Sequence, residues 1–466
     1  MGLTNRFFFY NCKPKDLSRG GWIIKDNVFQ ISTTLTFIES HNRIYNWLNG
    51  EYVEFEDISH PFLHLVKNKS ENFNKFKYDN SFDDFNWLID NKFIVSNHKE
   101  VQDIILNRAK ELDSSQNLHL TLLPAQMACN FNCPYCYEDK KQKSRMGQNE
   151  KEIILNYINK RADLKNLQIE WFGGEPLLGK DFILDFSQAV YNLAKLKNID
   201  YRSSMTTNGF YLTSELFQKL VNLNIKAFQI TIDGLEENHN KLRPLSNGEP
   251  TFKTIIHNLT EISKLKSLDF NIVLRTNFNE NSDINGYIEF MKNLDLSKDK
   301  RFAFIFRPIE SDLNDLQNDV SCSKIESSSL QKSYEDKAIN NALEKGDLFL
   351  YKDIGSHSCP ASRENALILY PDMTVRKCTV ALDNPKNMVG IIKSDGNLVK
   401  NENWDLWTLN TNSIYNKPDC LTCSFNPQCL SSACPLEFID NMNIACPSES
   451  SNLENLSNSI IDFIES

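Results

Sequence analysis

Short apolar runs alternate with longer amphipathic segments between residues 115 and 310. The short runs predict six β-strands, at residues 118–123, 167–172, 201–206, 227–232, 271–277 and 302–307. Between them, apolar residues recur every three or four positions, which predicts helices that include residues 152–161, 182–196, 216–223 and 255–265. Near-continuous apolar strands that alternate with helices indicate βα units around a parallel sheet.

Six βα units in a segment of this length fit an incomplete (β/α)6 barrel better than a closed barrel of eight strands. The fold class is therefore predicted to be α/β. In both architectures the carboxyl ends of the parallel strands meet at one edge of the sheet, and ligands bind there. We therefore expect the functional side chains in the loops that follow the strands.

Residues 1–110 follow a different pattern. Alternating apolar and polar residues at 43–47 and 52–55 flank an Asn49-Gly50 turn and predict a β-hairpin. Residues 62–66 and 85–89 predict short amphipathic helices, and residues 93–95 predict a closing strand. Together these elements predict a small α+β module that is winged-helix-like.

The rest of the chain divides into three parts. Residues 311–357 are polar with helical spacing, which predicts a helical bridge. Residues 358–450 carry seven cysteines, several prolines and little periodicity, so we expect metal or cross-links to hold them. Residues 451–466 include the apolar run 460–464, which predicts a terminal docking helix.

Composition narrows the function classes. Of 466 residues, 41% are hydrophobic and 24% are charged, close to the globular average. The net charge of −10 argues against nucleic acid or an anionic membrane as the main partner. No window approaches the ~20 apolar residues that span a bilayer, and the apolar run 7–10 is too short for a signal-peptide core. We therefore expect a cytoplasmic protein.

Twelve cysteines are clustered rather than evenly spread. In a reducing compartment such clusters are more often metal ligands than disulfides. One group of three lies near residue 130, and a second group of seven lies in residues 358–450. Cys12 and Cys322 stand apart, and we expect them to be ordinary buried thiols.

The first cysteine group directly follows the first predicted strand. Its three members, Cys129, Cys133 and Cys136, have the spacing C-x3-C-x2-C. Three thiolates on a tight loop can ligate three corners of a four-iron cluster and leave one iron open, where S-adenosylmethionine can chelate. A structural zinc site is the alternative, but zinc prefers four ligands in two pairs. The closest downstream histidine is His239, far from this loop.

This loop, and Trp171-Phe-Gly173-Gly174-Glu175-Pro176 after the second strand, resemble a radical S-adenosylmethionine (SAM) enzyme. The seven later cysteines resemble the SPASM domain, which carries auxiliary clusters in one branch of that superfamily. The resemblance covers residues from about 115 to 450. It implies three [4Fe-4S] clusters and S-adenosyl-L-methionine as cofactors. An electron from the first cluster would then cleave the sulfonium and release a 5′-deoxyadenosyl radical.

The resemblance also implies which strand ends contact the cofactor. Gly173, Gly174, Glu175 and Pro176 would bind its amine, and Tyr135 would lie near its adenine. Later strand ends supply Ser204, Thr207, Asn208, Thr231 and Asp233 as further contacts. Arg243 or Arg275 is the expected partner of the cofactor carboxylate, and the sequence does not decide between them. For each of these later residues, an ordinary structural hydrogen bond is the alternative.

The resemblance divides the later cysteines into two sets. Cys420, Cys423, Cys429 and Cys446 would ligate an outer auxiliary cluster, and Cys359, Cys378 and Cys434 an inner one. Three thiolates leave the inner cluster one ligand short, unless Cys322 or another group completes it. We expect that vacancy to accept a substrate thiolate. A zinc ribbon is the alternative for this region.

Two departures from the family pattern affect this assignment. Four residues lie between Cys429 and Cys434, where the family has three, and Met373 stands where the family has glycine. Both departures lie in the segment that would hold the auxiliary clusters.

Enzymes of this branch mostly modify peptides or proteins. The amino-terminal module resembles the element that binds the leader of a ribosomally made precursor peptide by adding a strand to its sheet. Sulfatase-maturating enzymes typically lack such a module and place an acidic base where this chain has Thr379. We therefore predict a peptide maturase that installs a thioether, with a carbon–carbon or carbon–oxygen crosslink second, and a flavodoxin- or ferredoxin-type electron donor.

Three other functions stay open. They are an anaerobic sulfatase-maturating enzyme, a radical enzyme that acts on a small molecule, and a non-catalytic iron–sulfur or zinc protein.

Overall fold

The computed structural model describes residues 15–16, 30–55, 61–67, 85–136, 138, 144–278, 282–309, 358–408, 418–430, 434–441, 446 and 453–465. The predicted bridge at 311–357, together with Cys12 and Cys322, lies outside these residues. The chain divides into two compact units. The first contains described residues between 114 and 309 and between 364 and 407, and the second contains the others.

The first unit is built on a ten-stranded sheet with the order β12-β11-β10-β9-β8-β7-β13-β14-β15-β16. Six neighbouring strands are parallel and match the six predicted strands to within two residues at each end. They are β7 (Asn117–Leu122), β8 (Asn166–Trp171), β9 (Asp200–Thr207), β10 (Ile225–Thr231), β11 (Asn271–Phe278) and β12 (Phe302–Pro308). The large, mostly parallel sheet of a partial barrel is therefore confirmed.

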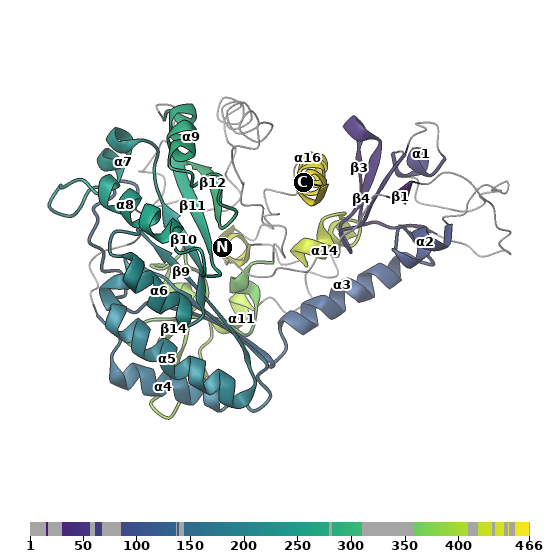
Figure 1. Cartoon of the computed structure of the whole chain (residues 1–466). Helices are drawn as coiled ribbons and strands as arrows, with labels where there is room; N and C mark the ends of the chain where they lie inside the picture. Colours follow the sequence, from purple (N-terminus) through teal and green to yellow (C-terminus); the bar gives the residue numbers. More distant parts are fainter. Residues whose placement is uncertain are drawn as a thin grey trace. The chain divides into compact units, whose positions relative to one another are not determined.

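Helices cover one face of this sheet (Figure 1). They are α4 (Gln148–Asn159), α5 (Lys180–Lys197), α6 (Ser214–Asn222), α7 (Glu236–Leu242), α8 (Phe252–Ser263) and α9 (Ile284–Asn293), and the four predicted helices are among them. The ring centroids of Trp171 and Phe186 of α5 are 5.9 Å apart. Those of Phe228 and Phe217 of α6 are 4.7 Å apart. This helix-covered face is apolar, which explains the apolar runs in the sequence.

The other face of the same strands is polar. Side chains alternate along a strand, so the residues between the buried apolar ones point away from the helices. On β7 to β10 these residues are His119, Thr121, Gln168, Glu170, Ser204, Thr206, Gln229 and Thr231. The interior of a closed barrel is instead filled by branched apolar side chains. Strands β7 to β10 are thus apolar on one face only.

Four strands in the cysteine-rich segment extend the sheet, although the sequence showed little periodicity there. Strand β13 (Ala366–Leu369) pairs in parallel with β7. It is followed by antiparallel β14 (Thr374–Arg376), β15 (Met388–Ile392) and β16 (Leu398–Lys400), and by the short helix α11 (Trp404–Trp407). Single 3-10 turns occur at η2 (Pro176–Gly179) and η4 (Pro385–Asn387).

The second unit contains a four-stranded sheet with the order β1-β5-β4-β3. Its strands are β1 (Lys15–Asp16), β3 (Leu35–Ile38), β4 (Arg43–Asn46) and β5 (Tyr52–Glu54), so the predicted hairpin is confirmed. Strand β2 (Gln30–Ile31) pairs with β6 (Ile94–Val95). Helices and 3-10 turns complete the unit: η1 (Glu39–His41), α1 (Pro61–Lys67), α2 (Phe85–Asp90), α3 (His98–Leu112), η3 (Pro360–Ser362), α13 (Pro418–Leu421), α14 (Asn426–Cys429), α15 (Pro435–Asn441) and α16 (Leu453–Glu465). The winged-helix-like description of residues 1–110 stays a prediction.

One hydrophobic core joins the amino- and carboxyl-terminal parts of the second unit. Tyr45 of β4, together with Trp47 just after that strand, packs with Phe425 and with Ile460 and Ile461 of α16. The ring centroid of Trp47 lies 5.0 Å from that of Phe425. A helix is therefore present where the terminal helix was predicted, and Ile460 and Ile461 of the predicted apolar run lie in this core.

None of the described helices is both long enough and apolar enough to cross a membrane.

Candidate active site

The three-cysteine loop follows β7 at the carboxyl edge of the sheet. Another loop holds it in place: Phe131 forms a β-bridge with Leu245, and the Asn132 N–H donates to the Pro244 carbonyl at 2.9 Å. None of the three cysteines is in a disulfide, and Cys129 and Cys133 are half-buried. The sequence therefore presents three thiols on a backbone that is fixed on both sides.

The donor set of this loop fits a four-iron cluster. Among the described residues, no three His, Cys, Asp or Glu side chains gather closely enough to hold a single metal ion. In a four-iron cluster each thiolate binds a different iron, so its ligands need not converge on one point. Three thiolates would also leave one iron for a ligand from outside the chain. Ligation by Cys129, Cys133 and Cys136 stays a prediction that this geometry supports.

Gly173 and Gly174 follow β8 and lie against the segment that leads to the cysteine loop. Their φ angles are +82° and +44°, and a Cβ on Gly174 would lie 2.1 Å from the Ala128 carbonyl oxygen. The Glu175 N–H donates to that oxygen at 2.8 Å. Only glycine allows both the left-handed conformation and this approach. The glycines thus bring two backbone segments of the site together.

Glu175 is fully buried and already holds three donors. Its carboxylate accepts from the Leu177 N–H at 2.9 Å, the Thr207 hydroxyl at 2.7 Å and the Asn208 N–H at 2.7 Å. Burial raises the pKa of Glu175, and these hydrogen bonds oppose that rise. The carboxylate therefore links the ends of β8 and β9. Its predicted contact with the cofactor amine would compete with three internal hydrogen bonds.

Tyr135, between two of the loop cysteines, is the centre of a buried polar network. Its hydroxyl donates to the carboxylate of Asp233 and accepts from Arg243 Nη1 at 2.6 Å. Asp233 also accepts from the Asn277 N–H at 2.9 Å. Burial raises the pKa of Asp233, with Arg243 opposing the rise. Burial likewise raises the pKa of the Tyr135 phenol. The network ties the cysteine loop to the ends of β10 and β11.

The two candidate arginines differ in what they already bind. Arg243 is nearly buried, with its guanidinium 5.6 Å from the centre of the Phe131 ring. Its Nε has no hydrogen-bond partner among the described residues. In Arg275, by contrast, Nε donates to Asn277 Oδ1 at 2.9 Å. Arg243 therefore keeps a donor for an anionic ligand.

The other predicted contacts are brought to the same region to different degrees. Asn208 donates through Nδ2 to Asn130 Oδ1 at 2.8 Å, which links β9 to the cysteine loop. Ser204 is buried on the polar face, and its hydroxyl has no partner among the described residues. Thr231 stands opposite Arg275 in the parallel register. Pro176 begins η2, directly after the carboxylate of Glu175.

Sequence reasoning missed three residues that make polar contacts in or beside this region. The carboxylate of Glu138 accepts from the Gly174 N–H at 2.5 Å. On the polar face, His119 and Glu170 lie within ion-pair distance. The alternation of polar residues along β7 and β8 was the signal for that pair, but the apolar runs obscured it.

The later cysteines are distributed over both units. Cys378, after β14, belongs to the first, where its N–H donates to Asn387 Oδ1 at 2.9 Å. The remaining six belong to the second: Cys359, Cys420, Cys423, Cys429, Cys434 and Cys446. Burial, followed by the nearby Cys434 thiol, raises the pKa of Cys359, so these two predicted inner ligands are neighbours. None of the seven is in a disulfide, and their grouping around two clusters stays a prediction.

The backbone at Met373 adopts a conformation that glycine adopts more easily than other residues do. Its φ is +63°, in the left-handed region, where it closes the turn between β13 and β14. The Met373 N–H donates to the Tyr370 carbonyl at 2.9 Å. The departure from the family pattern therefore costs conformational strain, but the turn itself forms.

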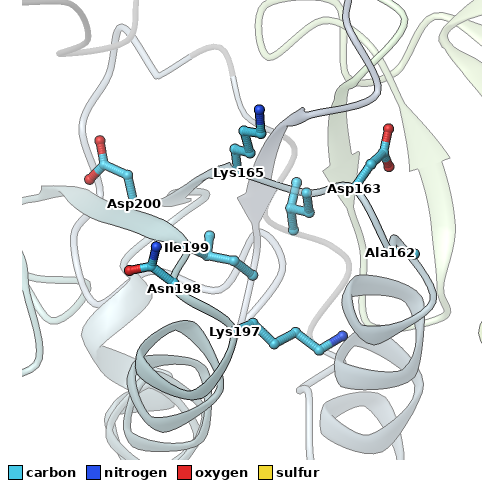
Figure 2. Close-up of a pocket in the computed structure, with 8 residues that line it drawn as sticks. Ala162, Asp163, Lys165, Lys197, Asn198, Ile199 and Asp200 are labelled. Carbon is cyan, nitrogen blue, oxygen red and sulfur yellow. The ribbon is translucent and has the colours of Figure 1, made fainter.

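A hollow lies at the opposite end of the sheet. Figure 2 shows it at the amino ends of β8 and β9, lined by Ala162, Asp163, Leu164, Lys165, Lys197, Asn198, Ile199 and Asp200. In parallel α/β barrels this end serves stability, while catalytic residues lie at the carboxyl end. The hollow therefore does not compete with the site at the cysteine loop.

Comparisons with known proteins point to the same region. Residues 123–285 match the model of the Radical SAM superfamily. The chain is 26% identical over 288 residues to the radical SAM cyclopropyl synthase TigE of Paramaledivibacter caminithermalis, covering 55% of this chain and 58% of TigE. It is 29% identical over 211 residues to a cysteine-type anaerobic sulfatase-maturating enzyme of Clostridium novyi, covering 43% of this chain and 53% of that enzyme. The chain thus matches little more than half the length of these relatives.

A solved structure shows the same fold. Native anSMEcpe with bound AdoMet and Cp18Cys peptide aligns with a TM-score of 0.52 at 19% identity. The alignment covers 75% of this chain and 99% of that one.

Proposed function

This chain contains a radical SAM domain, and on that basis we propose that it is an enzyme that crosslinks side chains in a ribosomally made peptide. The observation that carries the proposal is the meeting of three cysteine thiols that are in no disulfide, the Gly173-Gly174 backbone and Arg243 at one edge of the sheet. Each comes from a different loop, and each suits one part of S-adenosylmethionine bound to an open iron.

In this proposal the chain's own residues hold and orient the cofactors. Cys129, Cys133 and Cys136 would hold the cluster, and the bound cofactors would supply a 5′-deoxyadenosyl radical. Arg243 would use its unpartnered Nε and its charge for the cofactor carboxylate. Tyr135 and Asp233 would fix the position of that guanidinium through the hydrogen bond between Tyr135 and Arg243.

The peptide substrate is supported by the relatives. The sulfatase-maturating relative acts on a protein by its name, and anSMEcpe was solved with a peptide bound. We favour a thioether because the inner cysteine set would leave a cluster position for a substrate thiolate. The similarity to TigE, named a cyclopropyl synthase, favours a carbon–carbon bond as the second candidate.

The two flanking regions complete the proposal. The cysteines of residues 358–450 would carry two auxiliary clusters as a SPASM domain, and the strands of residues 30–55 would bind a leader peptide by strand addition. A flavodoxin- or ferredoxin-type protein would supply electrons. Thr379, an alcohol where an acidic base is expected, argues against sulfatase maturation even though sulfatase-maturating enzymes are among the relatives.

The first experiment measures 5′-deoxyadenosine. The protein is purified without oxygen, reconstituted with iron and sulfide, and given S-adenosylmethionine and dithionite. We expect nucleoside from the wild type and none from Cys133→Ala. Absence of nucleoside from both, with zinc bound in place of iron, would favour a non-catalytic metal protein.

The second experiment finds the substrate. A library of short synthetic peptides that vary Cys, Ser, Thr, Tyr and Asn is incubated with the active enzyme. Any crosslink removes two hydrogen atoms, so mass spectrometry detects it whichever bond forms. Peptides with and without an added amino-terminal leader segment then test leader binding without truncating the enzyme.

A further inference from the structure

His119 and Glu170 form a buried acid–base pair on the polar face of the sheet. His119 Nε2 lies 3.5 Å from Glu170 Oε2, and each side chain is only 12% exposed. The Thr121 hydroxyl donates to the same carboxylate oxygen at 3.3 Å. Thr121 is directly opposite Glu170 in the register of β7 and β8, so the strand pairing itself sets this contact.

The pair can hold one more proton. At 3.5 Å the Nε2–Oε2 contact is longer than an ordinary hydrogen bond, and Nε2 has no partner among the described residues. Burial acts to raise the pKa of Glu170, but interactions that include those with His119 and Thr121 outweigh burial and lower that pKa. The carboxylate is therefore charged, and a proton placed on Nε2 would turn the contact into a charge-assisted hydrogen bond.

Neighbouring side chains on the same face also have unused hydrogen-bonding atoms. Gln168 Nε2 and the Ser204 hydroxyl are buried without partners among the described residues. Gln168 is opposite His119 in the register, and Ser204 is opposite Glu170. Leaving such buried groups unpaired is unfavourable, so a bound ligand that hydrogen-bonds them is favoured. The peptide group, with both an acceptor and a donor, matches this surface.

Other acid–base groups of the site are already committed. Glu175 holds three donors, and Asp233 holds Tyr135 and the Asn277 N–H. His239 uses both ring nitrogens, accepting from the Asp233 N–H and contacting the Thr251 hydroxyl. The charged groups that face the His119–Glu170 pair on the neighbouring strands are few. Arg202 stands opposite Gln168 and is paired with Asp200, and β13 presents the uncharged Ala366 opposite His119.

We infer that the His119–Glu170 pair is the proton acceptor of the crosslinking reaction. This inference rests on the proposed function. In that reaction one substrate C–H bond gives its hydrogen atom to the 5′-deoxyadenosyl radical, and an X–H bond, with X sulfur, oxygen, nitrogen or carbon, gives its hydrogen as a proton. The proton goes to the pair and the C–X bond forms. The one electron left over would pass to an oxidised iron–sulfur cluster, which the seven cysteines of residues 358–450 would hold.

The test compares His119→Gln, Glu170→Gln and the double variant, using a library peptide that the wild type crosslinks. The readout is the ratio of crosslinked peptide to 5′-deoxyadenosine, which separates bond formation from cofactor cleavage. We expect each single substitution to lower this ratio about 100-fold at neutral pH, as loss of a general base does. The double variant should be no worse than either single one, because the two residues act as a unit. His257→Gln, at an exposed position on α8, is the control and should change nothing.

A second readout needs no turnover. Protein labelled with ¹⁵N-histidine reports which ring nitrogen carries the proton, and the His119 signal is assigned by its absence from His119→Gln. We expect Glu170→Gln to shift that signal and no other histidine signal. If both single variants keep the wild-type ratio, the inference is wrong while the proposed function stands. If the wild type crosslinks no peptide of the library, the proposed function fails and the inference fails with it.

Discussion

Gly174 lies against Ala128 so closely that a Cβ on Gly174 would be 2.1 Å from the Ala128 carbonyl oxygen. This contact joins the loop after β8 to the segment that carries the cluster cysteines. Both partners are backbone, so neither can rotate away. The geometry of the candidate site therefore depends on the absence of a single methyl group.

Gly174→Ala tests this contact. We expect a loss of at least about 3 kcal/mol in the free energy of unfolding, from the clash together with the left-handed φ. Gly248→Ala is the matched control, since its φ is also positive at +86° but no atom lies within 4 Å of the added Cβ. Gly248→Ala should lower the free energy of unfolding by only about 1 kcal/mol. Chemical denaturation of the cluster-free protein measures both, and equal losses would contradict the close contact.

Arg243 and Arg275 are distinguished by conservative substitution. We expect Arg243→Lys to weaken S-adenosylmethionine binding by about 10-fold or more, because lysine cannot reproduce a planar two-donor contact with a carboxylate. Arg275→Lys should have a smaller effect, because Arg275 already donates to Asn277. Calorimetric titration of the reconstituted protein measures both affinities. A larger loss in Arg275→Lys would reverse the assignment.

Glu175 makes stability depend on pH in a defined direction. Its pKa in the folded protein is raised above the ordinary 4.5 by burial. The folded state therefore binds the proton more tightly than the unfolded chain does, and stability falls as pH rises from 4.5 through the folded pKa. Glu175→Gln removes this titration but also loses hydrogen bonds from Thr207 or Asn208.

The measurement is the free energy of unfolding of the cluster-free protein at about pH 5 and about pH 8. We expect the wild type to lose more stability between these two conditions than Glu175→Gln does. If the wild type instead gains stability relative to Glu175→Gln between the lower and the higher pH, the pKa of Glu175 is lowered and not raised.

At position 373 we expect a glycine variant to be more stable than an alanine variant, which is the reverse of the order in a helix. Because its φ is +63°, we expect Met373→Gly to be more stable than Met373→Ala by about 1 kcal/mol. Gln188, exposed in the middle of α5, provides the opposite case. There the alanine variant should be more stable than the glycine variant by about 1 kcal/mol. Thermal unfolding of the four variants checks the prediction, and the same order at both positions would rule it out.

Ile461 tests the core that joins the two ends of the chain in the second unit. Its side chain is fully buried against the sheet that contains Trp47. We expect Ile461→Ala to cost about 2–5 kcal/mol, whereas Leu196→Ala, at a position that is 84% exposed, should cost little. Urea denaturation followed by circular dichroism compares them. A small loss of stability in Ile461→Ala would mean that α16 is not part of this core.

The same core changes how leader binding should be tested. Removing residues 1–110 would uncover Phe425, Ile460 and Ile461, so the truncated chain would lose a core as well as a binding module. Shortening the peptide, rather than the enzyme, separates the two effects.

Local sequence determined the strand–helix rhythm and the cysteine loop. Apolar periodicity predicted β7 to β12 because each strand buries one complete face against helices. The spacing of Cys129, Cys133 and Cys136 is itself local, so its chemistry could be predicted without a fold. The terminal helix could be predicted for the same reason, since Ile460 and Ile461 of its apolar run lie in the core.

Tertiary structure decided which polar groups meet. Tyr135 and Arg243 are 108 residues apart, and no local pattern pairs them. The His119–Glu170 pair follows from the register of β7 against β8, where a shift of one residue would place one of the two side chains on the other face. The strands β13 to β16 are only three to five residues long, too short for a periodic signal. Periodicity records what one segment buries, whereas hydrogen-bond partners are chosen by segments that the fold brings together.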